Sequence, residues 1–390
     1  MPIVTIPVGP QHPALHEPLL LRVHLDGEAV VSVDFVTGYN HRGIEKLAES
    51  NTWMKTLYIV TRVCGICNMM HSTCYVNALE EILGVEPPPR ARWLRVLAME
   101  LERMHSHMLL AAVMAEIIGY ESLFMIVMRD RETVMHMKEV LTGGRVIADY
   151  VWPGGVRRDL SEEKREKLLS KIPRLRERLR WLSRVYEEDP MIRKRLENVG
   201  VIKASTAVSY GLMGPVLRGS GVAYDTRAAY PYEAYSEAES LRVVSRREGD
   251  SLARMQVRIE EALVSLDLVE EALRRLPQGP INALRVPPRI VKPGEAVARV
   301  EAPRGELLYH VVSRGGRQPY RVKIRTPSFP NILNTFHAYR GATLSDVPVI
   351  LASMDPCISC MERLLVVDTR TGKQYTAPMR RIARGRWRPG

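Results

Sequence analysis

The sequence predicts an α+β fold in which a central helix bundle carries small β-sheets at its periphery. Segments with apolar residues at helical spacing fill the middle of the chain, and shorter apolar runs broken by Pro and Gly lie nearer both ends. Hydrophobic residues make up 46% of the 390 residues, which is ample for a large core. We expect one domain over 1–390, with a β-rich section at 1–40, a helical core at 43–276, a second β-rich section at 277–345, and a cysteine motif with the C-terminal tail at 350–390.

The first section is expected to be a hairpin or small sheet. Apolar and polar residues alternate between Leu19 and Val36, and Asp26-Gly27 marks a turn between two strands. From Gly43 to Leu83 the apolar spacing becomes helical. The first cysteine motif lies within this helical segment.

Four further segments follow in the helical core. After a break at Glu86–Pro89, the run from Arg90 to Gly119 predicts a long buried helix, whose methionines we interpret as core fillers. Ser161–Tyr186 predicts a charged surface helix, and Asp250–Leu276 predicts an amphipathic helix. Between these two, Gly211–Tyr235 is rich in Gly, Pro, Tyr and Ala and predicts a long loop.

The last part of the chain returns to β-structure. Short apolar runs between Pro and Gly residues from Pro277 to Thr343 predict a small β-rich section. Beyond the final cysteine, Leu364–Lys373 predicts a strand that enters a Gly-containing turn.

The formal net charge of the chain is +12. Two interpretations stay open: an acidic partner such as a subunit or anionic lipid, or an arginine-rich surface typical of a thermophile or a GC-rich genome. No RNA-binding signature or zinc finger is present in the sequence, so nucleic acid is not an expected partner.

Membrane association is expected only through a partner. The most apolar stretch, Met108–Met128, is interrupted by Glu116 and Glu121, so it lacks the roughly 20 apolar residues in a row that a membrane span requires. Met1–Val4 begins no signal sequence. Cysteines in Cys-x-x-Cys spacing, with an odd total, fit a reducing cytosol.

Four of the five cysteines form two Cys-x-x-Cys pairs, Cys64 with Cys67 and Cys357 with Cys360. Two such turns can enclose a soft transition metal in thiolate sulfur. Zinc ribbons separate their pairs by roughly 15–20 residues, whereas nearly the whole chain separates these two. The spacing therefore favours a buried metal centre that spans the fold. Cys74 has no motif partner and is expected to be a small buried hydrophobe.

The residues around the pairs resemble a known family. Arg62–His71 reads Arg-x-Cys-Gly-x-Cys-x-x-x-His, and Asp355–Cys360 reads Asp-Pro-Cys-x-x-Cys. Both resemble the cysteine motifs of the large, catalytic subunit of nickel–iron (NiFe) hydrogenases. Five further motifs, in order, resemble the energy-converting, membrane-associated branch, which is related to the quinone-site subunit of complex I: Gly9–Pro18, His41–Glu45, Gly155–Asp159, Leu217–Gly221 and Glu301–Glu306. The resemblance extends from about Gly9 to Arg363.

The resemblance implies a fold like that of the hydrogenase large subunit, with a NiFe centre. All four paired cysteines would hold nickel, and the iron would carry carbon monoxide and cyanide. By this match Cys67 and Cys360 would bridge the two metals, while Cys64 and Cys357 would bind nickel alone.

Splitting dihydrogen needs a Lewis-acidic centre and a nearby base that takes the proton. Glu17 matches the glutamate that passes protons to and from Cys357; the alternative is a glutamate that caps a turn. Arg304 matches an arginine over the open metal face, where a guanidinium can orient a weak ligand. Its alternative role is a surface ion pair.

Three further residues have expected roles near the centre. Asp355 is expected to pair with Arg304 or to cap the final turn. His71 stands four residues after Cys67, where it can donate a hydrogen bond to that thiolate; the alternative is a purely structural histidine. Glu45 matches a glutamate near a second metal in some relatives, so an additional Mg or Fe there is a further expectation.

His105 and His107 lie two positions apart on a predicted helix. Side chains at that spacing face different sides, so the two are not expected to share a metal.

The resemblance favours the catalytic subunit of a membrane-bound energy-converting hydrogenase, which interconverts H2 with protons and electrons. The sequence has no further set of cysteines for an electron-transfer cluster, so an iron–sulfur small subunit carrying a 4Fe-4S cluster is an expected partner. The resemblance also implies membrane-embedded complex I- or antiporter-like subunits that translocate ions. The expected location is the cytoplasmic side of the membrane, peripheral and held by those partners.

Two alternatives stay open. The first is a non-catalytic quinone-binding subunit, which His16 favours because complex I subunits place a quinone-contacting histidine there. Those subunits have lost the cysteines, their tyrosine would fall near Gly65, and Glu17 replaces their glycine, so the enzyme is favoured. The second alternative is a related sulfur- or polysulfide-reducing complex.

The tail carries one more expectation. In many relatives a protease removes the residues after a His or Arg close behind the final cysteine, and Arg363 holds that place. The strand expected within Leu364–Lys373 favours a retained tail, and the alternative is an uncleaved precursor.

Overall fold

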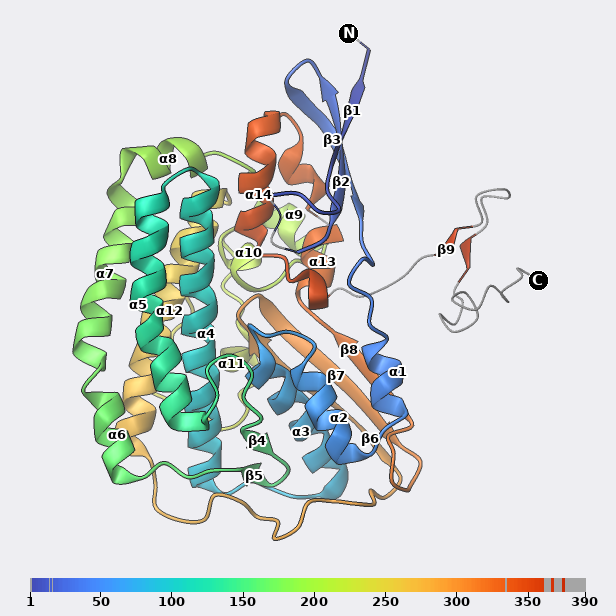
Figure 1. Ribbon diagram of the computed structural model, residues 1–390, viewed down its shortest axis with the longest axis vertical. Helices are drawn as coiled ribbons and strands as arrows, with labels where there is room; N and C mark the ends of the chain where they lie inside the picture. Colours follow the sequence, from blue (N-terminus) through green and yellow to red (C-terminus); the bar gives the residue numbers. More distant parts are fainter. Residues whose placement is uncertain are drawn as a thin grey trace.

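A bundle of long helices forms the centre of the protein (Figure 1). The computed structural model describes residues 2–13, 15, 17–333 and 335–360, and the backbone of a strand pair at Val366–Val367 and Gln374–Tyr375. Helix α4 (Pro89–Ile117) packs against α5 (Glu121–Thr142) and α12 (Ser251–Arg275), and α7 (Ile172–Glu188) packs on α12. The remaining helices of the described residues are α1 (Ile44–Glu49), α2 (Trp53–Thr61), α3 (Asn68–Leu83), α6 (Glu162–Leu169), α8 (Pro190–Leu196), α9 (Ala204–Ser209), α10 (Gly214–Arg218), α11 (Thr226–Ala229), α13 (Ser328–Leu333) and α14 (Val347–Met354).

Small antiparallel sheets lie beside this bundle (Figure 1). One three-stranded sheet has the order β1-β2-β3 and projects beyond α14, and a second, β6-β7-β8, packs on α3. The pairs β4-β5 and β9-β10 form two-stranded sheets. The strands are β1 (Val4–Val8), β2 (Leu20–Asp26), β3 (Ala29–Val36), β4 (Val151–Trp152), β5 (Gly155–Val156), β6 (Gly294–Ala302), β7 (Gly305–Ser313), β8 (Arg321–Arg325), β9 (Val366–Val367) and β10 (Gln374–Tyr375). In β2, alternate residues are buried, which is the pattern of a sheet with one face on the core.

Local signals explain where the long helices begin. Pro89 opens α4, where its missing N–H would have had no helical partner. Asp250 caps α12 by accepting a hydrogen bond from the backbone N–H of Ala253 at 2.8 Å. The four methionines of α4, at 99, 104, 108 and 114, are at most 2% exposed within the main hydrophobic core. Their interpretation as core fillers is confirmed.

Most expected elements are present. The hairpin around Asp26-Gly27, the helical segment before Leu83, and the helices at Arg90–Gly119 and Asp250–Leu276 are confirmed. The β-rich section after Pro277 contains β6, β7 and β8. In the tail, β9 overlaps the strand expected within Leu364–Lys373; the rest of that segment and Arg363 lie outside the described residues.

Two expectations were wrong in detail. Ser161–Tyr186 forms two helices, α6 and α7, because Pro173 lacks the N–H needed to continue a helix and starts a new one. The loop expected at Gly211–Tyr235 contains the short helices α10 and α11. Within the described residues, no helix is both long and apolar enough to cross a membrane.

Candidate metal centre

The first cysteine pair lies in the short connection between α2 and α3. Cys67 directly precedes α3, whose first turn is anchored from α4: the Glu102 carboxylate accepts hydrogen bonds from the Met69 N–H at 2.6 Å and from the Asn68 amide at 2.5 Å. Glu102 is fully buried and also pairs with Lys138 at 3.4 Å. This network fixes the loop that presents Cys64 and Cys67.

The second pair follows α14. Asp355 ends that helix in the left-handed conformation, with φ of 54°, and a 3-10 turn covers Ile358–Cys360. The Cys357 N–H donates to the Ser328 hydroxyl at 3.0 Å, and the Thr326 hydroxyl donates to the Cys360 carbonyl at 2.8 Å. These bonds orient both cysteine side chains of the turn.

Arg42 joins the two cysteine turns. Its guanidinium donates to the carbonyls of Arg62 at 2.8 Å and Val63 at 2.7 Å on one side, and to the carbonyl of Ser359 at 3.1 Å on the other. Arg42 lies within the His41–Glu45 motif, which by itself predicts no role for it. A guanidinium has five N–H donors, so it can bridge several carbonyls at once.

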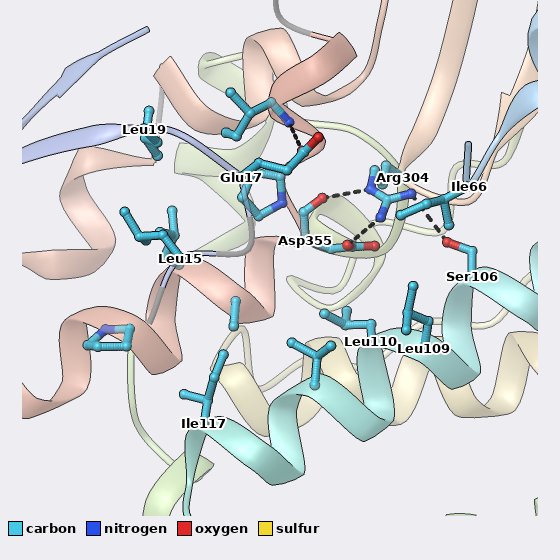
Figure 2. A pocket seen from close by; sticks show the side chains of 16 residues that line it. Leu15, Glu17, Leu19, Ile66, Ser106, Leu109, Leu110, Ile117, Arg304 and Asp355 are labelled. Carbon is cyan, nitrogen blue, oxygen red and sulfur yellow. Dashed lines mark hydrogen bonds and ion pairs between the residues drawn. The ribbon is translucent and has the colours of Figure 1, made fainter. Parts of the chain in front are cut away.

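Glu17 approaches the second turn from the N-terminal segment (Figure 2). Its carboxylate accepts hydrogen bonds from the Ile358 N–H, the Ser359 N–H at 3.3 Å and the Ser359 hydroxyl at 2.5 Å. The turn-capping contact, given as the alternative to a proton relay, is therefore present. Glu17 also stands next to Cys357, because Ile358 is the following residue.

Arg304 and Asp355 form a buried ion pair, as expected for Asp355 (Figure 2). Arg304 donates to the Asp355 carboxylate at 2.7 Å, to the Asp355 carbonyl at 2.9 Å and to the Ser106 hydroxyl at 3.2 Å. Arg304 occupies the tight turn between β6 and β7, which packs against α10 so closely that a Cβ at Gly214 would lie 2.2 Å from the Arg304 carbonyl oxygen. The alternative of a surface ion pair is excluded, since Arg304 is only 6% exposed.

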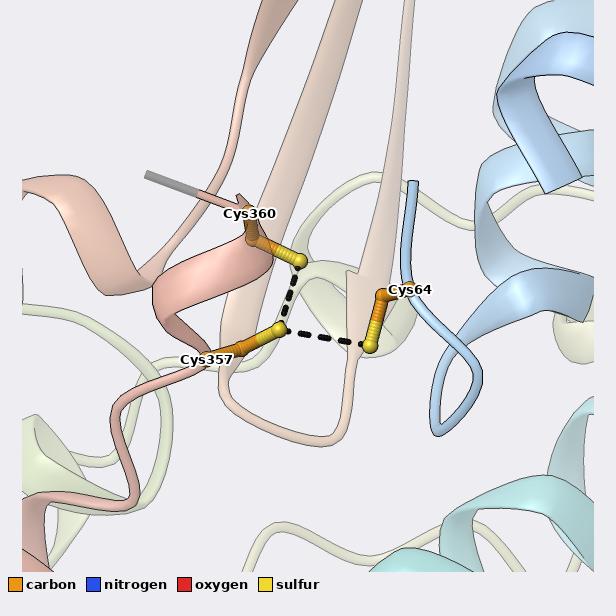
Figure 3. A group of neighbouring side chains, drawn as sticks. All are labelled: Cys64, Cys357 and Cys360. Carbon is orange, nitrogen blue, oxygen red and sulfur yellow. Dashed lines mark hydrogen bonds between the residues drawn. The ribbon is translucent and has the colours of Figure 1, made fainter. Parts of the chain in front are cut away.

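The four paired cysteines meet at one place, although the two pairs are nearly the whole chain apart. Figure 3 shows three of them, Cys64, Cys357 and Cys360. The Sγ of Cys357 lies 3.3 Å from that of Cys64 and 2.9 Å from that of Cys360, and the Sγ atoms of Cys67 and Cys360 are 4.0 Å apart. All four are free thiols. Sulfurs bound to one tetrahedral metal at about 2.3 Å would lie about 3.8 Å apart. Cys64, Cys357 and Cys360 form one group that could hold a metal ion, and Cys67, Cys360 and His71 form a second.

The electrostatics of the cluster also suit a cation. Hydrogen bonds from Cys357, Cys360 and Cys67 hold the pKa of the Cys64 thiol well below its usual value. Hydrogen bonding to Cys357, Cys64 and Cys67 raises the pKa of Cys360, because one negative sulfur disfavours a second beside it. Four buried thiolates at this spacing would require nearby positive charge, which a divalent metal and Arg304 can supply.

Arg304 keeps its charge in this buried position. Burial opposes the guanidinium charge, but Asp355 and the thiols of Cys357 and Cys64 more than offset burial and raise the pKa of Arg304 well above its usual value. Burial also raises the pKa of Asp355. Arg304 thus places a permanent positive charge beside the sulfur cluster.

A largely apolar cavity of about 190 Å³ opens onto this group (Figure 2). Glu17, Arg304 and Asp355 provide its polar end, and side chains of α4 and α14 line the remainder, among them Leu109, Leu110, Val113, Ile117, Leu351 and Ala352. Such a cavity admits small apolar molecules to the polar end.

A ring nitrogen of His71 lies within 4.8 Å of the sulfurs of both Cys67, the expected partner, and Cys360. The His71 Nε2 lies 3.7 Å from the Sγ of Cys360, the later cysteine of the second pair. The His71 Nδ1 lies 2.6 Å from the Tyr309 hydroxyl. Burial lowers the pKa of His71 to about 4, so the imidazole is neutral at pH 7. The expectation named the Cys67 thiolate because sequence spacing shows only neighbours on the same helix.

Glu45 is already neutralised by protein cations. Its carboxylate accepts from the Ile324 N–H at 3.0 Å and pairs with Arg321 at 3.2 Å and Lys323 at 3.3 Å. A metal ion would have to displace or repel both cations. The geometry therefore gives no support to the expected additional Mg or Fe at Glu45.

The remaining singled-out residues fall outside the cluster. Arg131 donates to His105 at 2.9 Å, whereas the Nε2 of His107 lies 3.1 Å from Glu261, so these histidines do face different sides. Cys74 is fully buried, as expected. His16 lies outside the described residues.

Comparisons with known proteins place this geometry in a family. The model of the respiratory-chain NADH dehydrogenase 49 kDa subunit matches residues 118–290 and 286–363, and that of nickel-dependent hydrogenases matches residues 42–111. The carbon monoxide-induced hydrogenase of Rhodospirillum rubrum is 44% identical, over 93% of this chain and 100% of its own length. This chain belongs to the family of membrane-bound hydrogenase large subunits. The family is related to the 49 kDa subunit of complex I.

Two other proteins are similar over most of their length. The membrane-bound hydrogenase subunit alpha of Pyrococcus furiosus is 39% identical, over 93% of this chain and 88% of its own. A chain of the membrane-bound sulfane sulfur reductase, an archaeal respiratory membrane complex, matches with a TM-score of 0.87 and 35% identity, over 93% of this chain and 98% of its own. The expected fold class is thereby confirmed, and the family relationship supports an oxidoreductase.

Proposed function

We propose that this large subunit is the catalytic subunit of a membrane-bound, energy-converting hydrogenase that interconverts H2 with protons and electrons. The observation that carries the proposal is the gathering of four free cysteine sulfurs, with neighbouring Sγ atoms 2.9, 3.3 and 4.0 Å apart, beside a buried arginine and a carboxylate. Its hydrogenase relatives supply the reaction by similarity.

The four paired cysteines would hold a NiFe centre, with carbon monoxide and cyanide on the iron. When bound, that centre would supply the Lewis acidity and the redox capacity for cleaving dihydrogen. The protein's own residues would do the rest. The cavity would deliver the apolar gas, and Arg304, fixed by Asp355 and Ser106, would hold positive charge at the polar end.

Glu17 would carry the proton. Its carboxylate lies at the turn that contains Cys357, so a proton leaving that sulfur has an acceptor close by. The hydroxyl of Ser359, 2.5 Å from Glu17, orients the carboxylate and can share the proton.

Electrons would leave through a partner. The described residues hold no second group of cysteines for an iron–sulfur cluster, since the fifth cysteine, Cys74, is isolated and buried. We infer an iron–sulfur small subunit with a 4Fe-4S cluster, bound over the N-terminal segment at Gly9–Glu17 and the first cysteine loop. Membrane-embedded complex I- or antiporter-like subunits would hold the chain at the cytoplasmic side of the membrane and translocate ions.

A second candidate function is reduction of sulfur compounds. Its support is the structural likeness to a sulfane sulfur reductase and a cavity larger than dihydrogen requires, with a guanidinium at its inner end that suits an anionic sulfur chain.

Hydrogen evolution by the purified complex distinguishes the two functions. With reduced viologen as electron donor, the intact complex is expected to evolve H2, and Cys357→Ser is expected to abolish this activity. Cys74→Ser is the matched control, because Cys74 is buried outside the cluster and serine can keep its hydrogen bond to the Ala298 carbonyl. A complex that reduces polysulfide but neither evolves nor consumes H2 would establish the second function.

A further inference from the structure

We propose that Tyr309 is a positioning residue of the candidate metal centre, which fixes the orientation and tautomer of His71 so that this histidine donates a hydrogen bond to the Cys360 sulfur. The inference rests on the proposed function, because the orientation of His71 affects the metal centre only if Cys360 holds the metal.

Three groups from distant parts of the chain form a continuous hydrogen-bonded row. Tyr309 is on β7, His71 is on α3, and Cys360 ends the 3-10 turn after α14. The Tyr309 hydroxyl lies 2.6 Å from His71 Nδ1, and His71 Nε2 lies 3.7 Å from Cys360 Sγ. The two rings meet edge to face, with centroids 5.8 Å apart and planes at 76°. Tyr309 and His71 are at most 1% exposed, so neither ring can turn freely.

The chemistry of these three groups decides which atom donates in each hydrogen bond. A neutral imidazole has one nitrogen that donates and one that accepts. A sulfur in a cluster that carries negative charge is stabilised by a donor and repelled by a lone pair, so the proton belongs on Nε2. Nδ1 is then an acceptor, and the Tyr309 hydroxyl is the donor that satisfies it. The opposite arrangement would aim the Nε2 lone pair at the sulfur.

Other buried tyrosines in this protein show what a purely structural hydroxyl does. Tyr75 donates to the Trp53 carbonyl at 3.0 Å, and Tyr186 donates to the Ala111 carbonyl at 2.6 Å. Both satisfy backbone groups of the helical core. Tyr309 instead bonds to the side chain of His71, which contacts Cys360 of the cluster. Residues that hydrogen-bond to the neighbours of metal ligands in this way orient those ligands and tune the metal site.

The hydrogen bond from His71 would withdraw electron density from the Cys360 sulfur. A less electron-rich sulfur donates less to the metal it binds, so loss of the bond should increase back-donation to carbon monoxide and lower its stretching frequency. Tyr309→Phe removes only the hydroxyl. We expect this variant, in the intact purified complex, to shift the carbon monoxide band to lower frequency and to reduce turnover by about 10–100-fold, with nickel content retained.

Tyr75→Phe is the matched control. It removes a buried hydroxyl of the same size from the same helix as His71, one turn further along, and is expected to leave the infrared bands in place. A His71→Phe variant closes a double-mutant cycle: once His71 is absent, Tyr309→Phe should cause no further band shift.

The outcomes separate this inference from the proposed function. A wild-type complex with nickel and carbon monoxide bands, combined with unshifted bands in Tyr309→Phe, overturns the role of Tyr309 and leaves the proposed function standing. Equal shifts in Tyr309→Phe and Tyr75→Phe would likewise overturn it, because any lost buried hydroxyl would then suffice. A wild-type complex without nickel overturns the proposed function itself.

Discussion

Glu17 combines two contacts that the sequence presented as alternatives. Its carboxylate caps the second cysteine turn through the N–H groups of Ile358 and Ser359, and the same contact holds it beside Cys357. A carboxylate that is positioned by fixed donors loses little orientation when it exchanges a proton. The cap therefore serves the proposed relay.

Replacing Glu17 by glutamine tests the relay. The amide is similar in size but cannot bind and release a proton at neutral pH, so proton-dependent turnover should fall by about 10²–10⁴-fold, with nickel content unchanged. Hydrogen evolution and nickel analysis on the same preparation measure both quantities. Glu28→Gln, on the exposed tip of the β2–β3 hairpin, is the control. Unchanged turnover in Glu17→Gln would show that Glu17 only caps the turn and carries no proton.

Motifs identified the cluster residues but not all their contacts. The Cys-x-x-Cys pairs and the Arg304–Asp355 pair follow from motif chemistry, and the structure brings both together. Arg42 and Tyr309 had no assigned roles because their partners lie hundreds of residues away, and short motifs do not show such contacts. The same reason explains why the contact between His71 and Cys360 was not expected. The catalytic roles of Glu17, Arg304, Asp355 and His71 stay predictions.

At the scale of elements, strong local patterns fixed the helices and strands that carry the site. Alternation predicted the β2–β3 hairpin, and helical spacing with Pro at the start predicted α4. The boundary between α6 and α7 was missed because leucine spacing continues across it, although Pro173 interrupts the backbone hydrogen bonds. The break between α4 and α5 coincides with Gly119, whose φ of 82° suits a helix end.

The anchoring of α3 to α4 gives a prediction about stability. Glu102→Ala would leave Lys138, 1% exposed, without its carboxylate and would leave the Met69 N–H without an acceptor. Breaking a buried pair in this way should cost about 3–5 kcal/mol, measured by chemical denaturation followed by circular dichroism. The first cysteine loop should lose its support, so nickel content should also fall.

Two comparison variants make this prediction specific. Glu102→Ala combined with Lys138→Met removes both buried charges and should recover much of the lost stability. Glu116→Ala alters an exposed residue of the same helix and should change stability by less than about 0.5 kcal/mol. If Glu102→Ala behaves like Glu116→Ala, the buried pair does not anchor the loop.

At the scale of the whole molecule, a buried ionic network connects the helix bundle to the turn that carries Arg304. Arg218 donates to Glu261 of α12 at 2.6 Å and to Glu301 of β6 at 2.8 Å, three residues before Arg304. Arg227 donates to Glu100 of α4 at 3.1 Å. Buried charges are tolerated only when paired, so the network requires the bundle and sheet to assemble together. The two ends of the chain can then meet at the cysteine cluster.

The nickel content of the purified membrane complex tests the central claim most directly. A NiFe centre held by the four paired cysteines requires about one nickel per chain, together with infrared bands of the carbon monoxide and cyanide on its iron. Cys64→Ser and Cys357→Ser should lose the nickel, whereas Cys74→Ser should keep it. An intact, correctly assembled complex without nickel, or one that keeps its nickel in both Cys64→Ser and Cys357→Ser, would contradict the account.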